Sequence, residues 1–247
     1  MKAILSPAKK LNFDDSHEVK MTKPLLLKKT DILVKVMKEK SVTDIKKLMK
    51  LSDDLSELNY NRYQKYESSK KAPAAFAFVG DTYQGLDFRG LSKKQQEYAN
   101  GTVYILSGLY GLLNVFDEIS PYRLEMGTGL KFDSYKNLYD FWKNDIAKTI
   151  NKYNSQNEPI VNLASEEYFK SVKREEVAAP IIDVKFLENK NGEFKTIGIM
   201  AKRARGMMAR FIVENKVQTV EELQNFNVDN YKFDKKSSTE NLLVFKR

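Results

Sequence analysis

The chain has 247 residues, 42% hydrophobic and 30% charged, a composition that can bury enough apolar surface for one globular domain spanning residues 1–247. Cysteine is absent and His17 is the only histidine, which excludes disulfides and sulfur-ligated metal sites, so we expect no metal and no cofactor. Lys and Arg outnumber Asp and Glu by 42 to 33, and the formal charge of +9 makes a polyanion a candidate partner.

The first residues form a short apolar run that predicts a buried strand. Residues 1–5 are mostly apolar, and Pro7 biases Ser6 toward extended geometry, which ends the strand there. The run is too short for the core of a signal peptide, which needs roughly 7 to 15 apolar residues. No other apolar run approaches the roughly 20 residues that cross a bilayer. We therefore expect a cytoplasmic protein with no membrane partner.

Helical and strand-like patterns follow in the first half of the chain. Apolar residues at spacings of three and four across residues 30–66 predict two helices that meet near residues 41–43. Residues 74–79 and 102–106 are apolar runs that lead into glycine-containing loops, which predicts two buried strands. Residues 160–165 predict another strand, which leads into a helix with Ser165 as its N-terminal cap.

The second half contains a predicted β-hairpin and a helix. Residues 181–187 and 194–200 are strand-like, and Asn191-Gly192 between them is a strong tight-turn signal. A helix is predicted from residue 201 to about residue 215, and residues 242–245 form a last short strand. These elements indicate a mixed α and β class, an α+β domain with a mixed sheet, surrounding helices and a hairpin in the C-terminal half.

On a helical wheel, the predicted helix at residues 201–215 has an apolar face and a cationic face. Its four cations lie within an arc of roughly 160°: Lys202, Arg203, Arg205 and Arg210. Gly206 lies near the centre of that arc, although glycine costs about 1 kcal/mol relative to alanine inside a helix. One interpretation is the close approach of a phosphate backbone. A second is a packed neighbour, with the cations solvated or paired with acids. A third, a helix lying on a membrane surface, ranks last, because the apolar face lacks the tryptophan and bulk that such helices favour.

Polar residues also stand after the first predicted strand. Ser6 and Lys9 match the S-x-x-K pattern of acyl enzymes, but the S-D-N and K-T-G elements that accompany it are missing, so a chance match is favoured. Lys9 and Lys10 are candidate contacts for a phosphate, because a backbone turn with two ammonium groups can hold one. His17 lies in a polar, charged stretch and is expected to be exposed.

Residues 107–111 contain two glycines, Gly108 and Gly111, after Ser107, in what the pattern predicts to be a strand-to-helix turn. The amides of such a turn can receive a phosphate oxygen. The segment distantly resembles the hairpin of helix-hairpin-helix DNA-binding elements, although those usually place their glycines two residues apart rather than three. A purely structural turn without any ligand is the alternative.

Six spaced segments, in order along the chain, resemble the peroxide stress protein YaaA family: residues 6–9, 80–86, 106–112, 121–127, 162–170 and 201–210. The agreement runs from Met1 through Lys246. The resemblance implies a single-domain, cytosolic, mixed α/β protein that helps to protect bacteria against peroxide by restraining iron-driven damage and that binds DNA through a basic cleft. It implies a DNA-facing role for the glycine turn and the basic helix, and it supplies no reaction.

The leading hypothesis is a DNA-binding protein of the peroxide stress response with low sequence specificity, because no homeodomain, zinc finger or basic zipper signature is present. Its partner would be duplex or structured DNA. The predicted contacts combine basic residues with the glycine positions: Lys9, Lys10, Ser107, Gly108, Gly111, Lys170, Lys173, Lys202, Arg203, Arg205, Gly206 and Arg210.

The rival hypothesis is an enzyme that acts on a nucleotide or a nucleic acid, with a substrate that the sequence does not specify. Its candidate catalytic residues are polar side chains at or near predicted strand ends: Ser6, Lys9, Asp81, Arg123 and Glu125. Arg123 and Glu125 alternate on one side of an extended segment and form either an internal ion pair or a reacting pair. A protein-binding or iron-sequestering role is the third alternative, since the chain offers almost only carboxylates for a metal.

Overall fold

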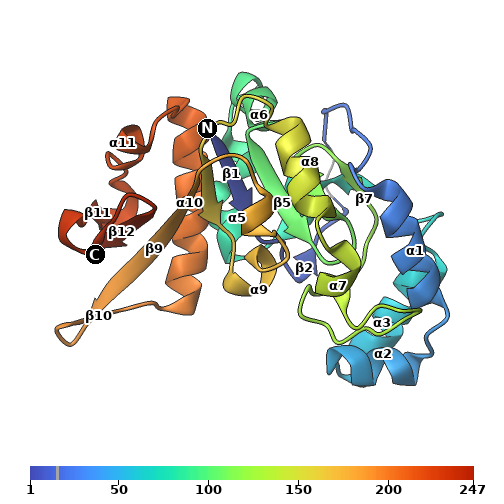
Figure 1. Ribbon diagram of the computed structural model, residues 1–247. Coiled ribbons are helices and arrows are strands. Elements are labelled where there is room, and N and C mark those ends of the chain that lie inside the picture. The colour runs from blue at the N-terminus through green and yellow to red at the C-terminus, as the bar shows by residue number, and fades with distance from the viewer. Residues whose placement is uncertain (15–16) are drawn as a thin grey trace.

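The fold is organised around one mixed sheet of eight strands, counted over residues 1–14 and 17–247, which the computed structural model describes (Figure 1). Seven strands follow one another in space: β11 (Lys232–Phe233), β12 (Leu242–Lys246), β9 (Ile181–Lys190), β8 (Ile160–Leu163), β1 (Lys2–Leu5), β5 (Val103–Ser107) and β6 (Gly111–Asn114). The eighth, β10 (Glu193–Lys195), pairs with β9. Neighbouring strands from β12 to β5 are parallel, whereas β11, β6 and β10 pair antiparallel.

In the part of the chain that the structure describes, two small sheets hold loops beside the central strands. β2 (Lys10–Leu11) pairs with β4 (Phe78–Val79), which brings the chain that follows β1 next to the end of β4. β3 (Ala72–Pro73) pairs with β7 (Glu118–Ile119). The first pairing bears on the site, because polar residues precede β2 and follow β4.

The connections of the central strands reverse direction at β1. From β1 the chain crosses to β5 on one side, whereas β8 lies on the other side of β1 and leads on to β9. β1 and β8 are parallel, so their carboxyl ends lie at the same edge of the sheet. In open α/β sheets, such a reversal leaves a crevice outside the carboxyl ends of the strands, where ligands bind.

Helices cover the sheet and extend the molecule at both ends. The α-helices of the described residues are α1 (Leu27–Lys38), α2 (Val42–Met49), α3 (Asp53–Gln64), α4 (Ala74–Ala77), α5 (Asp81–Leu86), α6 (Lys93–Ala99), α7 (Leu138–Trp142), α8 (Asp145–Tyr153), α9 (Glu166–Phe169), α10 (Gly198–Asn215) and α11 (Val220–Leu223). Figure 1 shows α1 to α3 grouped at one end, and α10 and α11 with the C-terminal strands at the other. The predicted α+β domain with a mixed sheet is confirmed. Within the described part of the chain, no helix has the length and apolar character that crossing a membrane requires.

Helices α5 and α10 pack with their backbones in close approach at two glycines. A Cβ on Gly206 would lie 1.8 Å from the carbonyl oxygen of Thr82, and a Cβ on Gly85 would lie 2.1 Å from the carbonyl oxygen of Arg203. Both glycines are buried. The interpretation of Gly206 as a phosphate contact is therefore wrong, because the neighbour that requires a glycine is α5.

Several predicted elements are confirmed. Strands β1, β5, β8 and β12 lie where the apolar runs placed them. The β9–β10 hairpin is also present, and its turn residues Asn191 and Gly192 both have positive φ, as expected of a tight Asn-Gly turn. The second hairpin strand is shorter than predicted, since it ends at Lys195 and Gly198 begins α10. Every residue of β10 is exposed, so burial does not favour a longer strand.

Two predictions in the first half are wrong. Residues 30–66 contain three helices rather than two, because Lys50 ends α2 in the left-handed conformation and Ser52 caps α3. Residues 74–79 form the single helical turn α4 before the short β4. A short apolar run suits a buried helix as well as a strand, and alanine has the highest helix propensity.

Candidate functional site

A pocket with a volume of about 350 Å³ opens at the carboxyl ends of β1 and β8, where the strand connections reverse. We call it the strand-end pocket. Its lining comes from the loop after β1 and from β2, from β4 and α5, from residues 122–125, from β8, α9 and the loop between them, and from α10: Ser6, Pro7, Ala8, Lys9, Lys10, Val79, Gly80, Asp81, Thr82, Tyr83, Tyr122, Arg123, Leu124, Glu125, Leu163, Ser165, Glu167, Tyr168, Lys202 and Arg205. The structure therefore brings all five candidate catalytic residues of the rival hypothesis into one pocket.

The hydroxyl of Ser6 connects the ends of β1 and β8. The backbone N–H of Ser165 donates to Ser6 Oγ at 2.8 Å, and Ser6 Oγ donates to Ser165 Oγ at 3.3 Å. The Tyr83 hydroxyl donates to the Ser6 carbonyl at 3.0 Å. Ser165 occupies the N-cap position of α9, but its side chain makes no capping hydrogen bond, so that part of the prediction is wrong. Its hydroxyl lies instead against Ser6, which fixes the two strand ends relative to one another.

Glu125 is the centre of an ion-pair group. Its Oε2 lies 3.2 Å from Lys9 Nζ, and its Oε1 lies 3.0 Å from a terminal nitrogen of Arg123. The Arg123 Nε–H also donates to Oε1 at 3.1 Å. The ion pair between Arg123 and Glu125 is thus present. In the S-x-x-K match, Lys9 pairs with Glu125, whereas Ser6 is hydrogen-bonded to Ser165. Both arrangements argue against an activated serine.

Arg205 and Lys202 reach the strand-end pocket from α10 without a carboxylate partner among the described residues. The Arg205 guanidinium is half-buried, and burial lowers its pKa. A partly buried charge without a partner is costly, because the protein does not replace the water that it loses. Asp81 has no hydrogen-bond or ion-pair partner in the described chain either. The pocket therefore contains charges of both signs that are free to meet a ligand.

Three tyrosines form buried parts of the pocket wall: Tyr83, Tyr122 and Tyr168. Burial raises the pKa of each phenol, so these side chains remain neutral hydrogen-bonding groups at physiological pH. The hydroxyls of Tyr122 and Ser107 lie 2.7 Å apart, within hydrogen-bond distance. Sequence reasoning missed the tyrosines, because isolated aromatic residues carry no positional signal of their own.

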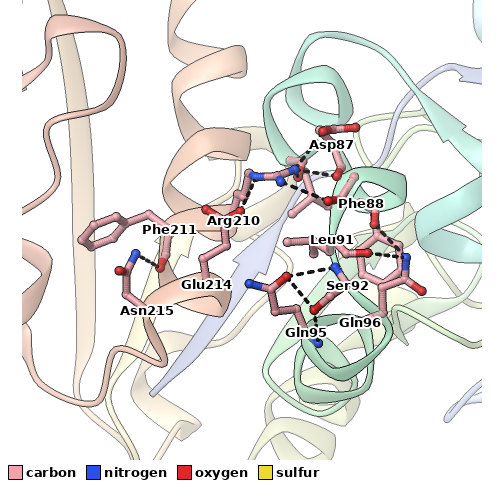
Figure 2. A network of polar contacts seen from close by, with 12 residues as sticks. Asp87, Phe88, Leu91, Ser92, Gln95, Gln96, Arg210, Phe211, Glu214 and Asn215 are labelled. Atoms are coloured by element: carbon pink, nitrogen blue, oxygen red, sulfur yellow. Dashed lines mark hydrogen bonds and ion pairs between the residues drawn. The ribbon is translucent and has the colours of Figure 1, made fainter.

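Arg210 belongs to the predicted cationic face, but contacts with other residues of the chain occupy its guanidinium (Figure 2). Its Nε–H donates to Glu214 at 2.8 Å, and a terminal nitrogen donates to the carbonyl and to the carboxylate of Asp87, at 2.7 and 2.9 Å. Arg210 thus satisfies backbone at the C-terminal end of α5 and holds α10 to it. Arg203 is exposed and lies outside the pocket lining.

Residues 107–111 form a buried turn between β5 and β6, so the predictions of a strand-to-helix turn and of a helix-hairpin-helix-like element are wrong. Ser107 is 0% exposed, and its Oγ accepts from the N–H groups of Leu109 and Tyr110. A Cβ on Gly108 would lie 2.3 Å from the Leu124 carbonyl oxygen, and one on Gly111 would lie 2.9 Å from an atom of the Trp142 ring. Ser107, Gly108 and Gly111 are therefore required for packing and do not face a phosphate.

A second hollow, of about 540 Å³, lies between α7, α8 and the end of α9. We call it the lysine pocket, after four of its lining residues: Lys143, Lys148, Lys170 and Lys173. Its two acids are already engaged, because Asp145 pairs with Lys29 at 2.5 Å and Asp140 accepts from the N–H of Lys136. No carboxylate in the described residues pairs with the four lysines. Lys170 and Lys173 were predicted contacts, whereas Lys143 and Lys148 were missed, since surface lysines on amphipathic helices look alike in sequence.

The two pockets lie on either side of α9. Glu167 lines the strand-end pocket, and its carbonyl oxygen accepts from the hydroxyl of Tyr139, which lines the lysine pocket, at 3.0 Å. The amine of Lys170 lies 5.7 Å from the centre of the Tyr139 ring. The hydrogen bond between Tyr139 and Glu167 therefore links the linings of the two pockets at α9.

His17 differs from its prediction. It is half-buried rather than exposed, with its ring centroid 5.9 Å from that of Phe76, and its Nδ1 has no hydrogen-bond partner in the described chain. Within residues 1–14 and 17–247, no group of three or more His, Cys, Asp or Glu side chains is placed to hold a metal ion.

The fold and the strand-end pocket define an α+β protein with a cation-rich pocket at the switch point of a largely parallel sheet. The sequence model of the peroxide stress protein YaaA family matches residues 1–237. A UPF0246 protein of Legionella pneumophila (strain Corby) is 46% identical over 255 residues, with 100% of this chain and 99% of the relative covered. UPF0246 proteins of Marinomonas sp. (strain MWYL1) and Crocosphaera subtropica are 44% and 41% identical over 252 and 248 residues, with at least 97% of each chain covered. The chain belongs to the peroxide stress protein YaaA family, and this membership supports a role in peroxide stress.

Proposed function

We propose that the protein binds DNA as part of the peroxide stress response, contacts phosphates with little regard to base sequence, and thereby helps to limit iron-driven damage. One observation carries the proposal. In the described part of the chain, eight cations in and next to the two pockets have no carboxylate partner: Lys10, Lys143, Lys148, Lys170, Lys173, Lys202, Arg203 and Arg205.

Unpaired cations on a concave surface favour a polyanion. Each lysine or arginine that meets a phosphate releases condensed counterions from the DNA, and this release drives binding. Three of the cations lie in the strand-end pocket and four in the lysine pocket, on either side of α9. One DNA backbone that crosses α9 would meet both groups.

The kind of contact supports low sequence specificity. Five of the eight cations are lysines of β2 and of the surface around α7, α8 and α9. Lysine presents a flexible point charge that suits a phosphate, whereas base readout requires donors and acceptors fixed toward the base edges. Lys9 contributes less than its exposure suggests, because Glu125 already offsets its charge.

Binding to duplex and bubble DNA, measured by fluorescence anisotropy over a range of salt concentrations, tests the proposal. The variant with Lys148, Lys170 and Lys173 changed to alanine should bind more weakly, and its log–log salt slope should fall by about 0.9 for each phosphate that is no longer neutralised. The matched control changes three exposed lysines of α1 and α2 that line neither pocket, Lys28, Lys35 and Lys47, to alanine. An equal loss in both variants would show that only net charge matters and would contradict a defined surface.

The link to iron-driven damage has its own test. Plasmid DNA exposed to ferrous iron and hydrogen peroxide should be nicked more slowly in the presence of the wild-type protein than in the presence of an inert protein at equal mass. The variant lacking Lys148, Lys170 and Lys173 should protect less. Equal protection by the variant, at concentrations where it leaves the DNA unbound, would separate protection from binding.

A second candidate function is an enzyme that acts on a nucleotide. It is favoured by the position of Asp81 and Glu125 in the same pocket as Lys202 and Arg205, because acid–base catalysis needs a carboxylate within reach of the bound substrate. Asp81→Asn and Glu125→Gln should abolish turnover and leave DNA affinity largely intact. Failure to find turnover with any nucleotide would contradict this candidate.

A further inference from the structure

We propose that the strand-end pocket binds one nucleoside 5′-phosphate, with the phosphate on Arg205 and Lys202 and a hydroxyl or amine of the nucleoside on Asp81. The proposal specifies the ligand of the second candidate function, an enzyme that acts on a nucleotide, and it rests on that function. It does not depend on the lysine pocket or on DNA binding.

The phosphate end of the pocket is defined by two cations of α10. Lys202 and Arg205 are three residues apart on one helix, so they lie on the same face, and both line the pocket. Arg205 is half-buried and unpartnered in the described chain. Its guanidinium stays charged and offers a planar fork that matches two phosphate oxygens. A phosphate dianion would balance both charges and relieve the cost of burying Arg205.

The remaining lining calls for more than an inorganic anion. Asp81 would be repelled by a bare phosphate, but it can accept hydrogen bonds from the hydroxyls or amines of a larger ligand. Five apolar side chains complete the wall and suit the face of a base or sugar: Pro7, Ala8, Val79, Leu124 and Leu163. Glu125 is held by Lys9 and Arg123 and adds little net charge.

Size and position agree with this ligand class. The pocket volume of about 350 Å³ lies at the lower end of the roughly 300–1,000 Å³ of small-molecule sites, which suits a single nucleotide rather than a dinucleotide. The pocket also lies at the reversal between β1 and β8, the place where open sheets with parallel strands bind phosphorylated ligands. The hydrogen bonds between Ser6 and Ser165 hold the strand ends in place before a ligand arrives.

Isothermal titration calorimetry on the full chain tests the proposal. The probes are the four deoxynucleoside and the four ribonucleoside 5′-monophosphates, the corresponding nucleosides without phosphate, and inorganic phosphate. At least one monophosphate should bind in the micromolar to low millimolar range, and its nucleoside should bind at least tenfold more weakly, as expected when hydrogen bonds to charged groups are removed.

Variants locate the site. Arg205→Ala should weaken nucleotide binding at least tenfold, and Arg205→Lys should restore part of it. The matched control is Arg203→Ala, an exposed cation on the same helix that does not line the pocket, and it should leave the affinity within twofold. Arg205 makes no ion pair within the described residues, so its removal should preserve the fold, which a thermal melt verifies.

Two further measurements are needed. One distinguishes a free nucleotide from a nucleotide of a DNA strand as the ligand, and the other distinguishes nucleotide binding from DNA binding. Displacement of bound nucleotide by single-stranded DNA would identify a nucleotide of a DNA strand as the occupant, and the absence of displacement would identify a free nucleotide. The variant lacking Lys148, Lys170 and Lys173 should bind nucleotide like the wild type even where it no longer binds DNA.

Three results would overturn the proposal. The first is that no monophosphate binds to the wild-type protein at millimolar concentration. The second is that Arg205→Ala and Arg203→Ala reduce affinity equally, which would indicate general electrostatic attraction. The third is that inorganic phosphate alone binds as tightly as the best nucleotide. None of these results would bear on DNA binding by the lysine pocket.

Discussion

Gly206→Ala tests the close packing of α10 on α5, which places Arg205 and Lys202 in the strand-end pocket. The added Cβ would lie 1.8 Å from the Thr82 carbonyl oxygen and 2.6 Å from the backbone nitrogen of Leu86, against 3.4 Å or more in an ordinary contact. Both neighbours are backbone atoms, so neither can turn away as a flexible side chain would. The helices must separate, or one of them must bend.

The expected size of the effect follows from two opposing contributions. Overpacking costs typically about 1–3 kcal/mol and occasionally more, whereas alanine gains about 1 kcal/mol over glycine inside a helix. Because the contact involves rigid backbone on both sides, the overpacking cost should lie at the upper end of its range, which leaves a net loss in the free energy of unfolding of about 2 kcal/mol. For a chain of this size, each kcal/mol lowers the melting temperature by roughly 2–4 °C.

The assay is urea unfolding followed by circular dichroism, with Gly198→Ala as the control. Gly198 is the first residue of the same helix, and a Cβ there meets nothing within 4 Å, so this change should be neutral or slightly stabilising. The moved helix should also weaken nucleotide binding in Gly206→Ala. A variant Gly206→Ala as stable as the wild type would refute the packing explanation of this glycine.

Three further changes have defined outcomes. Burial raises the pKa of Asp117 from 3.8 to about 6. Between these pH values the folded state holds a proton that the unfolded state has released. The stability that this group contributes is therefore present below about pH 4 and is lost as the pH rises through about 6. Asp117→Asn should therefore flatten the fall in urea midpoint between those pH values, and parallel curves for variant and wild type would contradict this. Arg210→Ala should lower the free energy of unfolding by about 1–2 kcal/mol without changing the salt slope of DNA binding. A changed slope would show that Arg210 contacts DNA. Gly111→Ala should lose about 1–2 kcal/mol or more, because its φ is +70° and Trp142 lies against it; an unchanged melting temperature would argue against that packing.

Local patterns predicted those parts of the fold that depend on neighbours in sequence. The strands β1, β5, β8 and β12 are short apolar runs bounded by polar or glycine residues, and the Asn191-Gly192 turn requires two positive φ angles that this pair readily adopts. Where a run was apolar throughout, as at residues 74–79, periodicity could not distinguish a helical turn from a strand.

The site depends on contacts between distant segments, and a helical wheel does not contain them. Arg205 and Arg210 are the same residue type on one predicted face, yet Arg210 meets Asp87, which is 123 residues away in sequence, while Arg205 enters a pocket. Gly206 was interpreted as a gap in the cationic face, because the residues of α5 that pack against it, Thr82 and Leu86, are equally remote in sequence. The sequence predicts that polar residues follow the strands. It does not predict that these residues line one pocket, because that depends on the order of the strands in the sheet.

Mapping of amide chemical shifts by NMR on addition of DNA tests the central claim most directly. The claim is that DNA meets the unpaired cations of the strand-end and lysine pockets. It predicts the largest shifts at Lys202, Arg205, Lys170 and Lys173, and none at residues 107–111, which are buried. Shifts confined to residues 107–111, or to the helices α1 to α3, which line neither pocket, would contradict it.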